Sequence, residues 1–138
     1  MRLLIVIVLF LFSSLAVAGG GLQFIDPWVR QAPPAAKMLA AYGELKNNGS
    51  ADVHIVAISS ELFDNVQMHT TRFDRGMMKM SESKELALKP GQSIVFAPNS
   101  HHLMLFRPAV AIKPGVMVPI RFKLTTGRVV RFVLPVKR

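Results

Sequence analysis

The segment IRFKLTTGRVVRFVLPV, residues 120–136, decides the fold class. Apolar and basic side chains alternate over residues 120–124, which is typical of a β-strand with one buried and one exposed face. Residues 125–127 predict a turn, and the apolar residues 129–136 predict a returning strand with Arg131 on its outer side. The segment is therefore predicted to be a β-hairpin.

Short apolar segments separated by turn residues extend this pattern through the chain. Residues 54–59 and 93–96 are further predicted strands. The recurring turn signals are Pro33-Pro34 and residues 47–50, 89–91, 98–100 and 113–115. Residues 35–41 have a weak helical period but could equally begin a strand. The sequence therefore predicts an all-β sandwich or barrel.

The N-terminal residues have the pattern of an export signal. Arg2 supplies a positive start, residues 3–12 are apolar, and Ala16-Val17-Ala18 is typical of a cleavage site. The apolar stretch is shorter than the roughly 20 residues needed to cross a bilayer, so an uncleaved anchor is the second choice. We expect a signal peptide at residues 1–18 and one domain at residues 19–138.

Composition narrows the chemistry that the domain can perform. The chain has no cysteine, and 17 Lys and Arg residues against 8 Asp and Glu residues give a formal charge of +9. Without cysteine there is no thiolate nucleophile, redox dithiol or Cys-based zinc site. The basic residues are scattered, without a dense run or interleaved aromatic residues. This argues against nucleic acid and fits an acidic protein partner.

One concentration of methionine and histidine lies around a predicted hairpin turn at residues 74–76. If the turn centres between Asp74 and Arg75, His69 lies directly opposite Met80, with Cβ atoms about 4.5–5.5 Å apart. Met78 then shares the face of Met80, and Met68 lies on the other face. We treat Met68 and Met78 as auxiliary ligands that could exchange with Met80.

A second concentration follows at residues 101–105. Side chains two apart on a strand point the same way, so His102 and Met104 share one face. His101, Leu103 and Leu105 share the opposite face. Beside the hairpin, such a strand brings two imidazole nitrogens and two thioether sulfurs around one point.

This ligand set favours monovalent copper. Thioether sulfur is a soft ligand that selects Cu(I), whereas zinc is bound by Cys, His and carboxylate. A blue-copper centre needs a cysteine thiolate, which is absent. The candidate metal ligands are therefore His69, Met80, His102 and Met104.

Two other interpretations stay open. The domain could be an enzyme, although no nucleophile and base can be paired from their spacing. It could also be a structural or adhesive sandwich in which methionine fills irregular gaps in the core. Metal analysis of the purified protein distinguishes the three interpretations, because a carrier would bind one equivalent of Cu(I) and show no turnover.

The spacing of the four candidate ligands resembles that of the periplasmic copper(I) chaperone family called PCu(A)C. Ten residues separate His69 from Met80, and twenty-one separate Met80 from His102, which opens His102-Leu103-Met104. The likeness spans about residues 25–136. It departs from the family at Phe106, where members often have another methionine. Some members also have a C-terminal tail rich in His and Met that binds copper(II), and we expect no such second site here.

The resemblance implies a cupredoxin-like Greek-key β-sandwich, exported to the periplasm, that carries one Cu(I) and is not an enzyme. It also implies delivery toward the copper A centre of cytochrome c oxidase, with subunit II as the acceptor and a thioredoxin-like assembly factor alongside. We expect a monomer that does not bind nucleic acid.

Overall fold

The computed structural model of the protein describes residues 21–138, so the expected signal peptide lies outside the described residues. The described chain is all β, with ten strands and no helix. The strands are β1 (Leu22–Arg30), β2 (Met38–Asn47), β3 (Val53–Ser59), β4 (Phe63–Asp74), β5 (Met77–Ser83), β6 (Leu86–Leu88), β7 (Ser93–Phe96), β8 (His102–Pro108), β9 (Met117–Leu124) and β10 (Val129–Lys137). Within residues 21–138 there is accordingly no helix long and apolar enough to cross a membrane.

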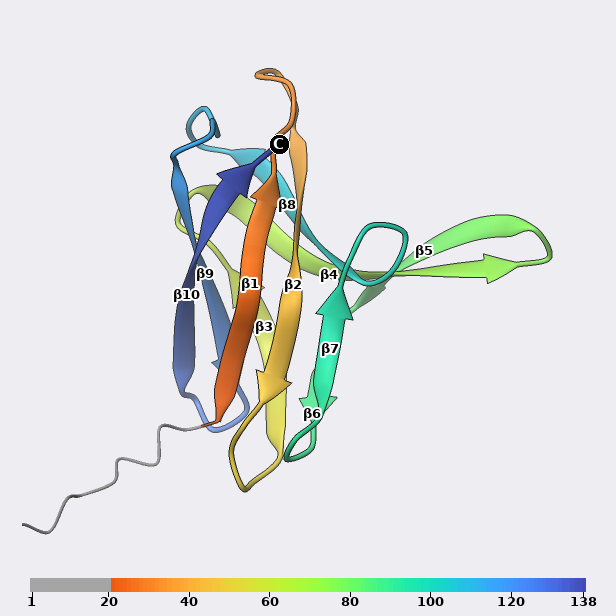
Figure 1. Cartoon of the computed structure of the whole chain (residues 1–138), viewed down its shortest axis with the longest axis vertical. Helices are drawn as coiled ribbons and strands as arrows, with labels where there is room; N and C mark the ends of the chain where they lie inside the picture. Colours follow the sequence, from red (N-terminus) through yellow and green to blue (C-terminus); the bar gives the residue numbers. More distant parts are fainter. Residues whose placement is uncertain (1–20) are drawn as a thin grey trace, which may run out of the picture.

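The strands form two layers that are joined through a parallel pair (Figure 1). Along the hydrogen-bonded path the order is β5-β4-β8-β2-β1-β10-β9-β3-β6, and β7 pairs with β2. β1 and β10 run parallel, whereas the other pairs of strands are antiparallel. The predicted cupredoxin-like Greek-key β-sandwich is confirmed.

Aromatic side chains from both layers meet in the core. The Phe24 ring on β1 contacts three other rings edge-on, with centroids 6.2 Å away for Phe96, 5.8 Å for Phe122 and 5.7 Å for Phe132. Edge-to-face pairs at these distances are favoured by the ring quadrupoles. Because β1 and β7 belong to one layer and β9 and β10 to the other, this cluster holds the two layers together.

The C-terminal segment folds as its alternation predicts. β9 and β10 form an antiparallel hairpin in which Arg121 lies opposite Arg131, and Ile120, Phe122 and Leu134 are buried. The predicted strands at residues 54–59 and 93–96 correspond to β3 and β7. The ambiguous residues 35–41 are a turn followed by the start of β2.

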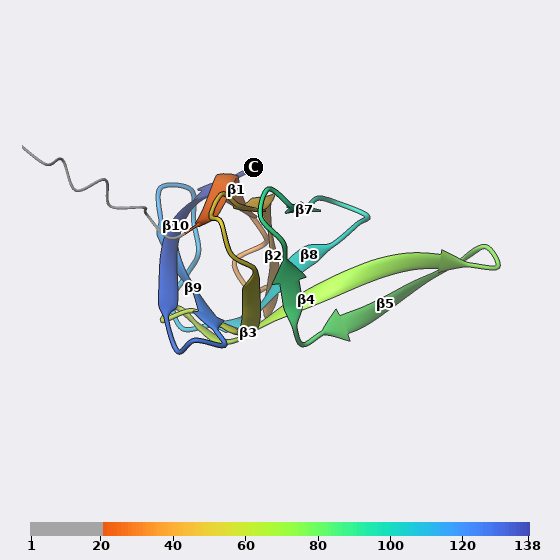
Figure 2. The same ribbon diagram turned by 90° about the horizontal axis from the view of Figure 1, so that it is seen from below.

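One hairpin extends beyond the sandwich. The first part of β4 pairs with β8, but after His69 the strand pairs with β5 alone. Figure 2 shows β4 and β5 projecting away from the two layers. We call residues 70–82 of this hairpin the arm.

Candidate metal centre

β8 carries His102 and Met104 on the outer face of the sandwich. The strand lies between β2 and β4, and Leu103 and Leu105 are completely buried in the core. Because side chains alternate along a strand, burial of the two leucines directs His102 and Met104 to the opposite face. The predicted division of this strand into an apolar face and a His-x-Met face is confirmed.

β4 brings the second histidine next to the first. His69 pairs directly with His102 across the two antiparallel strands, and the centroids of the two imidazole rings are 5.6 Å apart. Directly opposed residues point to the same side of a sheet. The pairing therefore places both candidate histidines together on the outer face, with Met104 two residues further along β8.

The His69 ring has one nitrogen without a protein partner. Its Nε2 lies 2.8 Å from Oε1 of Gln67, which accepts a hydrogen bond, so Nε2 carries the proton. Nδ1 then bears the lone pair, and this atom is buried with no hydrogen-bond partner. Buried polar side-chain atoms normally have a partner, and exceptions are frequent where an ion binds.

The His102 ring is oriented by the turn that precedes β8. Its Nδ1 donates to the backbone carbonyl oxygen of Ser100 at 3.0 Å, so Nε2 bears the lone pair. The turn is closed by hydrogen bonds from the Ala97 amide to the His101 carbonyl and from the Ser100 amide to the Ala97 carbonyl. A second hydrogen bond of this kind sets the tautomer and the direction of a metal-ligating imidazole.

The electrostatics of the pair favour neutral imidazole at His69. Burial and, secondly, the neighbouring His102 ring lower the pKa of His69 below its usual value of 6.5, while Glu82 opposes the shift. Burial disfavours the charged form because the imidazolium loses hydration. A lower pKa keeps the Nδ1 lone pair available for a metal near neutral pH.

Met104 lies between Ala40 on β2 and Gln67 on β4. On β2 its neighbour across the strands is Ala40, whose small side chain leaves room on the outer face. Phe106 follows two residues along β8, and the centroid of its ring lies 6.2 Å from that of His69. The position where the resemblance expects a further methionine thus has an aromatic ring packed beside the candidate ligands.

The predicted register of the β4–β5 hairpin is wrong. His69 lies opposite Glu82 and Met80 opposite Thr71. The turn centres between Arg75 and Gly76, one residue later than predicted, and both have positive φ, 51° and 79°. Two such residues form the type I′ turn that suits the twist of a hairpin, and glycine adopts positive φ without strain.

This shift in register leaves Met80 on the same face of the hairpin as His69 but increases the distance between the two residues. Met80 remains on the side of His69, as a diagonal neighbour two positions closer to the tip of the arm. Diagonal neighbours have Cα atoms roughly 7–8 Å apart, within reach of long side chains. Met80 is 54% exposed, whereas His102 is 7% exposed. His69, His102 and Met104 thus lie together, with Met80 at their open side.

The two auxiliary candidates lie in different surroundings. Met68 is buried in the hydrophobic core, on the face of β4 away from His69. It would reach the outer face only if β4 turned over, so it belongs with the core. Met78 lies on the same face as Met80 and is more than half exposed.

The sequence did not predict the two groups that orient the imidazole rings of His69 and His102. Gln67 precedes His69 by two residues on one strand, so the alternation itself could have indicated it. The Ser100 carbonyl group belongs to the backbone and leaves no signal in residue type. His101 is occupied elsewhere, because its Nδ1 lies 2.9 Å from Oγ1 of Thr70.

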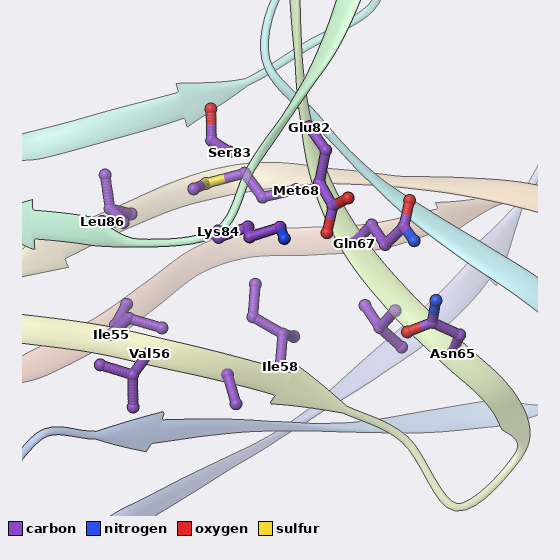
Figure 3. Close-up of a pocket in the computed structure, with 12 residues that line it drawn as sticks. Ile55, Val56, Ile58, Asn65, Gln67, Met68, Glu82, Ser83, Lys84 and Leu86 are labelled. Atoms are coloured by element: carbon purple, nitrogen blue, oxygen red, sulfur yellow. The ribbon is translucent and has the colours of Figure 1, made fainter.

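A pocket of about 280 Å³ lies next to Gln67 and Glu82, between β3, β4 and the end of β5 (Figure 3). Aliphatic side chains of β3, including Ile55 and Ile58, form one wall, and Gln67 and Glu82 lie on the other. Among the described residues no group of three or more His, Cys, Asp and Glu side chains could hold a metal ion.

Known proteins similar in sequence identify the family of this chain. Residues 22–136 match the family described as "Putative lipoprotein LpqE-like". A relative, "Putative lipoprotein Lxx21020" of Leifsonia xyli subsp. xyli, is 28% identical over 118 residues, which cover 85% of this chain and 70% of that protein.

Solved structures similar to this one include PCuAC domains. The apo domain from PmoF1 has a TM-score of 0.69 at 21% identity and covers 86% of this chain and 94% of its own. The copper-bound domain from PmoF2 has a TM-score of 0.69 at 17% identity, covering 86% and 93%. The Cu(I) form of DR1885 from Deinococcus radiodurans has a TM-score of 0.62 at 23% identity, covering 88% and 83%.

These findings define an all-β domain with the fold of PCuAC domains. The chain belongs to the LpqE-like family, and the resemblance to the PCu(A)C family drawn from its sequence is confirmed.

Proposed function

We propose that this protein is an exported copper(I) chaperone that binds one Cu(I) through His69, Met80, His102 and Met104. The ion is cargo, and the protein hands it to a partner without catalysing a reaction. The observation that carries the proposal is the buried Nδ1 lone pair of His69 beside the His102 ring.

The chemistry of the four groups supports a soft monovalent ion. Two neutral imidazoles and two thioethers provide no negative charge, and thioether sulfur selects Cu(I) among the common biological metals. Two of the solved neighbours are described as copper-bound and as a Cu(I) form. Neutral ligands also exchange more readily than thiolates, which suits a protein that releases its metal.

The placement of Met80 supports release to another protein. Three of the four groups lie on β4 and β8 against the sandwich, whereas the fourth lies on the exposed arm. Because Met80 lies on the exposed arm, it marks the side from which the ion can be approached and removed. An acceptor could then supply its own ligands from the open side.

The cellular location and the partners of the protein are part of the proposal. Relatives described as lipoproteins fit an exported protein, and we place this one in the periplasm after removal of its signal peptide. We propose delivery toward the copper A centre of cytochrome c oxidase, with subunit II as acceptor and a thioredoxin-like assembly factor alongside. The formal charge of +9 fits an acidic surface on the acceptor.

The test is anaerobic titration with Cu(I) in competition with a chromogenic chelator, followed by X-ray absorption of the loaded protein. One equivalent should bind, with sulfur and nitrogen neighbours. His102→Ala should weaken binding by about a hundredfold or more, since loss of an outer-sphere partner alone costs about 10–100-fold. The fold should persist because no buried charge is left behind.

The matched control is His101→Ala. His101 is adjacent in sequence, but its ring bonds to Thr70 and not to the candidate ligands. This variant should bind copper as the unmodified protein does. Loss of copper in His101→Ala with retention in His102→Ala would overturn the assignment, and the absence of any stoichiometric Cu(I) binding would overturn the proposed function.

A further inference from the structure

The two faces of the arm differ in chemistry. On the face away from His69, Lys79 and Asp74 form an ion pair with a nitrogen–oxygen distance of 2.9 Å. On the face that continues from His69, the side chains beyond Thr71 are Met80, Met78 and Phe73. The apolar row therefore starts at the candidate metal centre and runs to the tip of the arm.

This row is exposed although it is apolar. Phe73 is 70% exposed, and Met78 and Met80 are 56% and 54% exposed. A two-stranded hairpin without a layer beneath it is only marginally stable in water, and exposed apolar side chains do not add to its stability. Stability of the fold therefore does not explain why these residues occupy the copper-site face.

The spacing of the two methionines suits a shared ion. Met78 and Met80 are two apart on β5, so their Cα atoms are about 6.5–7 Å apart and their side chains point the same way. Unbranched methionine side chains with three rotatable bonds can bring their sulfur atoms together. Phe73 lies directly opposite Met78, where its ring would exclude water from one side of the sulfur.

We propose that Met78 and Met80 form a second, weaker Cu(I) position on the arm, through which the ion passes between the His-containing site and the acceptor. The inference rests on the proposed function and deepens it. The transfer is a ligand exchange in which copper stays monovalent. A bond from the Met78 sulfur forms while the bonds to the two imidazoles and to Met104 break, and Met80 remains bound throughout.

Met77 provides a matched control on the same strand. It is 63% exposed and adjacent to Met78, but it pairs with Asp74 on the opposite face of the arm. Met77→Leu and Met78→Leu thus remove sulfur from two similarly exposed side chains that are adjacent on β5. Only Met78→Leu removes sulfur from the row.

The experiment is a Cu(I) titration of the whole chain labelled with ¹³C at the methionine methyl groups. The first equivalent should shift the Met80 and Met104 signals. The second should shift Met78 and shift Met80 again, because the Met80 sulfur leaves the first ion, which stays on His69, His102 and Met104, and binds the second, while Met77 stays unchanged. Met78→Leu should weaken binding of the second equivalent by about tenfold or more, as for loss of a coordination-sphere group, without affecting the first.

Two results would overturn the inference while leaving the proposed function intact. One is a Met78 signal that stays still through both equivalents while Met80 and Met104 respond to the first. The other is an equal effect of Met77→Leu and Met78→Leu on the second equivalent. A titration in which neither Met80 nor Met104 responds overturns the proposed function itself and the inference with it.

Discussion

β8 and β5 each supply part of the candidate ligand set, but the protein holds them in opposite ways. β8 lies between two strands, and its leucines fill the core, so His102 and Met104 have fixed backbones. β5 pairs only with β4, and Met80 projects from it into solvent. The part of the site on β8 is therefore suited to binding an ion, and the part on β5 is suited to releasing it.

Hydrogen exchange should show the largest difference between β8 and the arm. Local opening free energies run from near zero in exposed hairpins to the global value in core strands, about 5–15 kcal/mol. Amide protons of the arm should therefore exchange about a thousandfold or more faster than those of Leu103 and Leu105. The measurement is amide exchange followed by NMR, and equal protection of the two regions would remove the basis for distinguishing them.

Removal of the hydrogen bond to His69 should have the next largest effect. In Gln67→Leu nothing holds the proton on Nε2, so Nδ1 can take it and lose its lone pair. Cu(I) affinity should fall by about 10–100-fold, the usual cost of losing an outer-sphere partner. Chelator competition measures the affinity, and ¹⁵N NMR of the ring reports the tautomer.

The control for this variant is Asn65→Leu. Asn65 lies two residues earlier on the same face of β4, opposite Phe106, and should not influence the His69 ring. It should leave both the tautomer and the affinity unchanged. Equal losses in the two variants would mean that Gln67 acts through the strand and not through its hydrogen bond.

Substitution of Glu82 should have the smallest effect, on the pH dependence of copper binding. Protonation of His69 competes with copper, so binding falls as the pH drops through the pKa of His69, which lies below 6.5. Glu82 raises that pKa, so Glu82→Gln should lower it and move the loss of copper to lower pH. The shift should be less than about one pH unit for an exposed carboxylate.

Copper occupancy measured against pH tests this sign. Asp74→Asn is the control, because Asp74 lies on the other face of the arm in its ion pair with Lys79. Its profile should match that of the unmodified protein. Movement of the Glu82→Gln profile toward higher pH would contradict the assigned influence of Glu82 on His69.

Much of the fold could be predicted where a single strand carries its own signal. Alternation in residues 120–124 indicated β9, and the same rule assigned the two faces of β8 before any partner strand was known. The hairpin turn was harder. Asp74 and Gly76 are both common in turns, and only the observed positive φ at Arg75 and Gly76 identifies the two central residues.

The amino-acid sequence by itself determined the types and spacing of the candidate ligands and the face of each strand on which they lie. These are local properties, since side-chain direction alternates with every residue. Tertiary structure decided that His69 pairs with His102, that Gln67 and the Ser100 carbonyl orient the two rings, and that Met80 lies on an exposed arm. Pairing between strands distant in sequence depends on the packing of the whole core, which no single segment encodes.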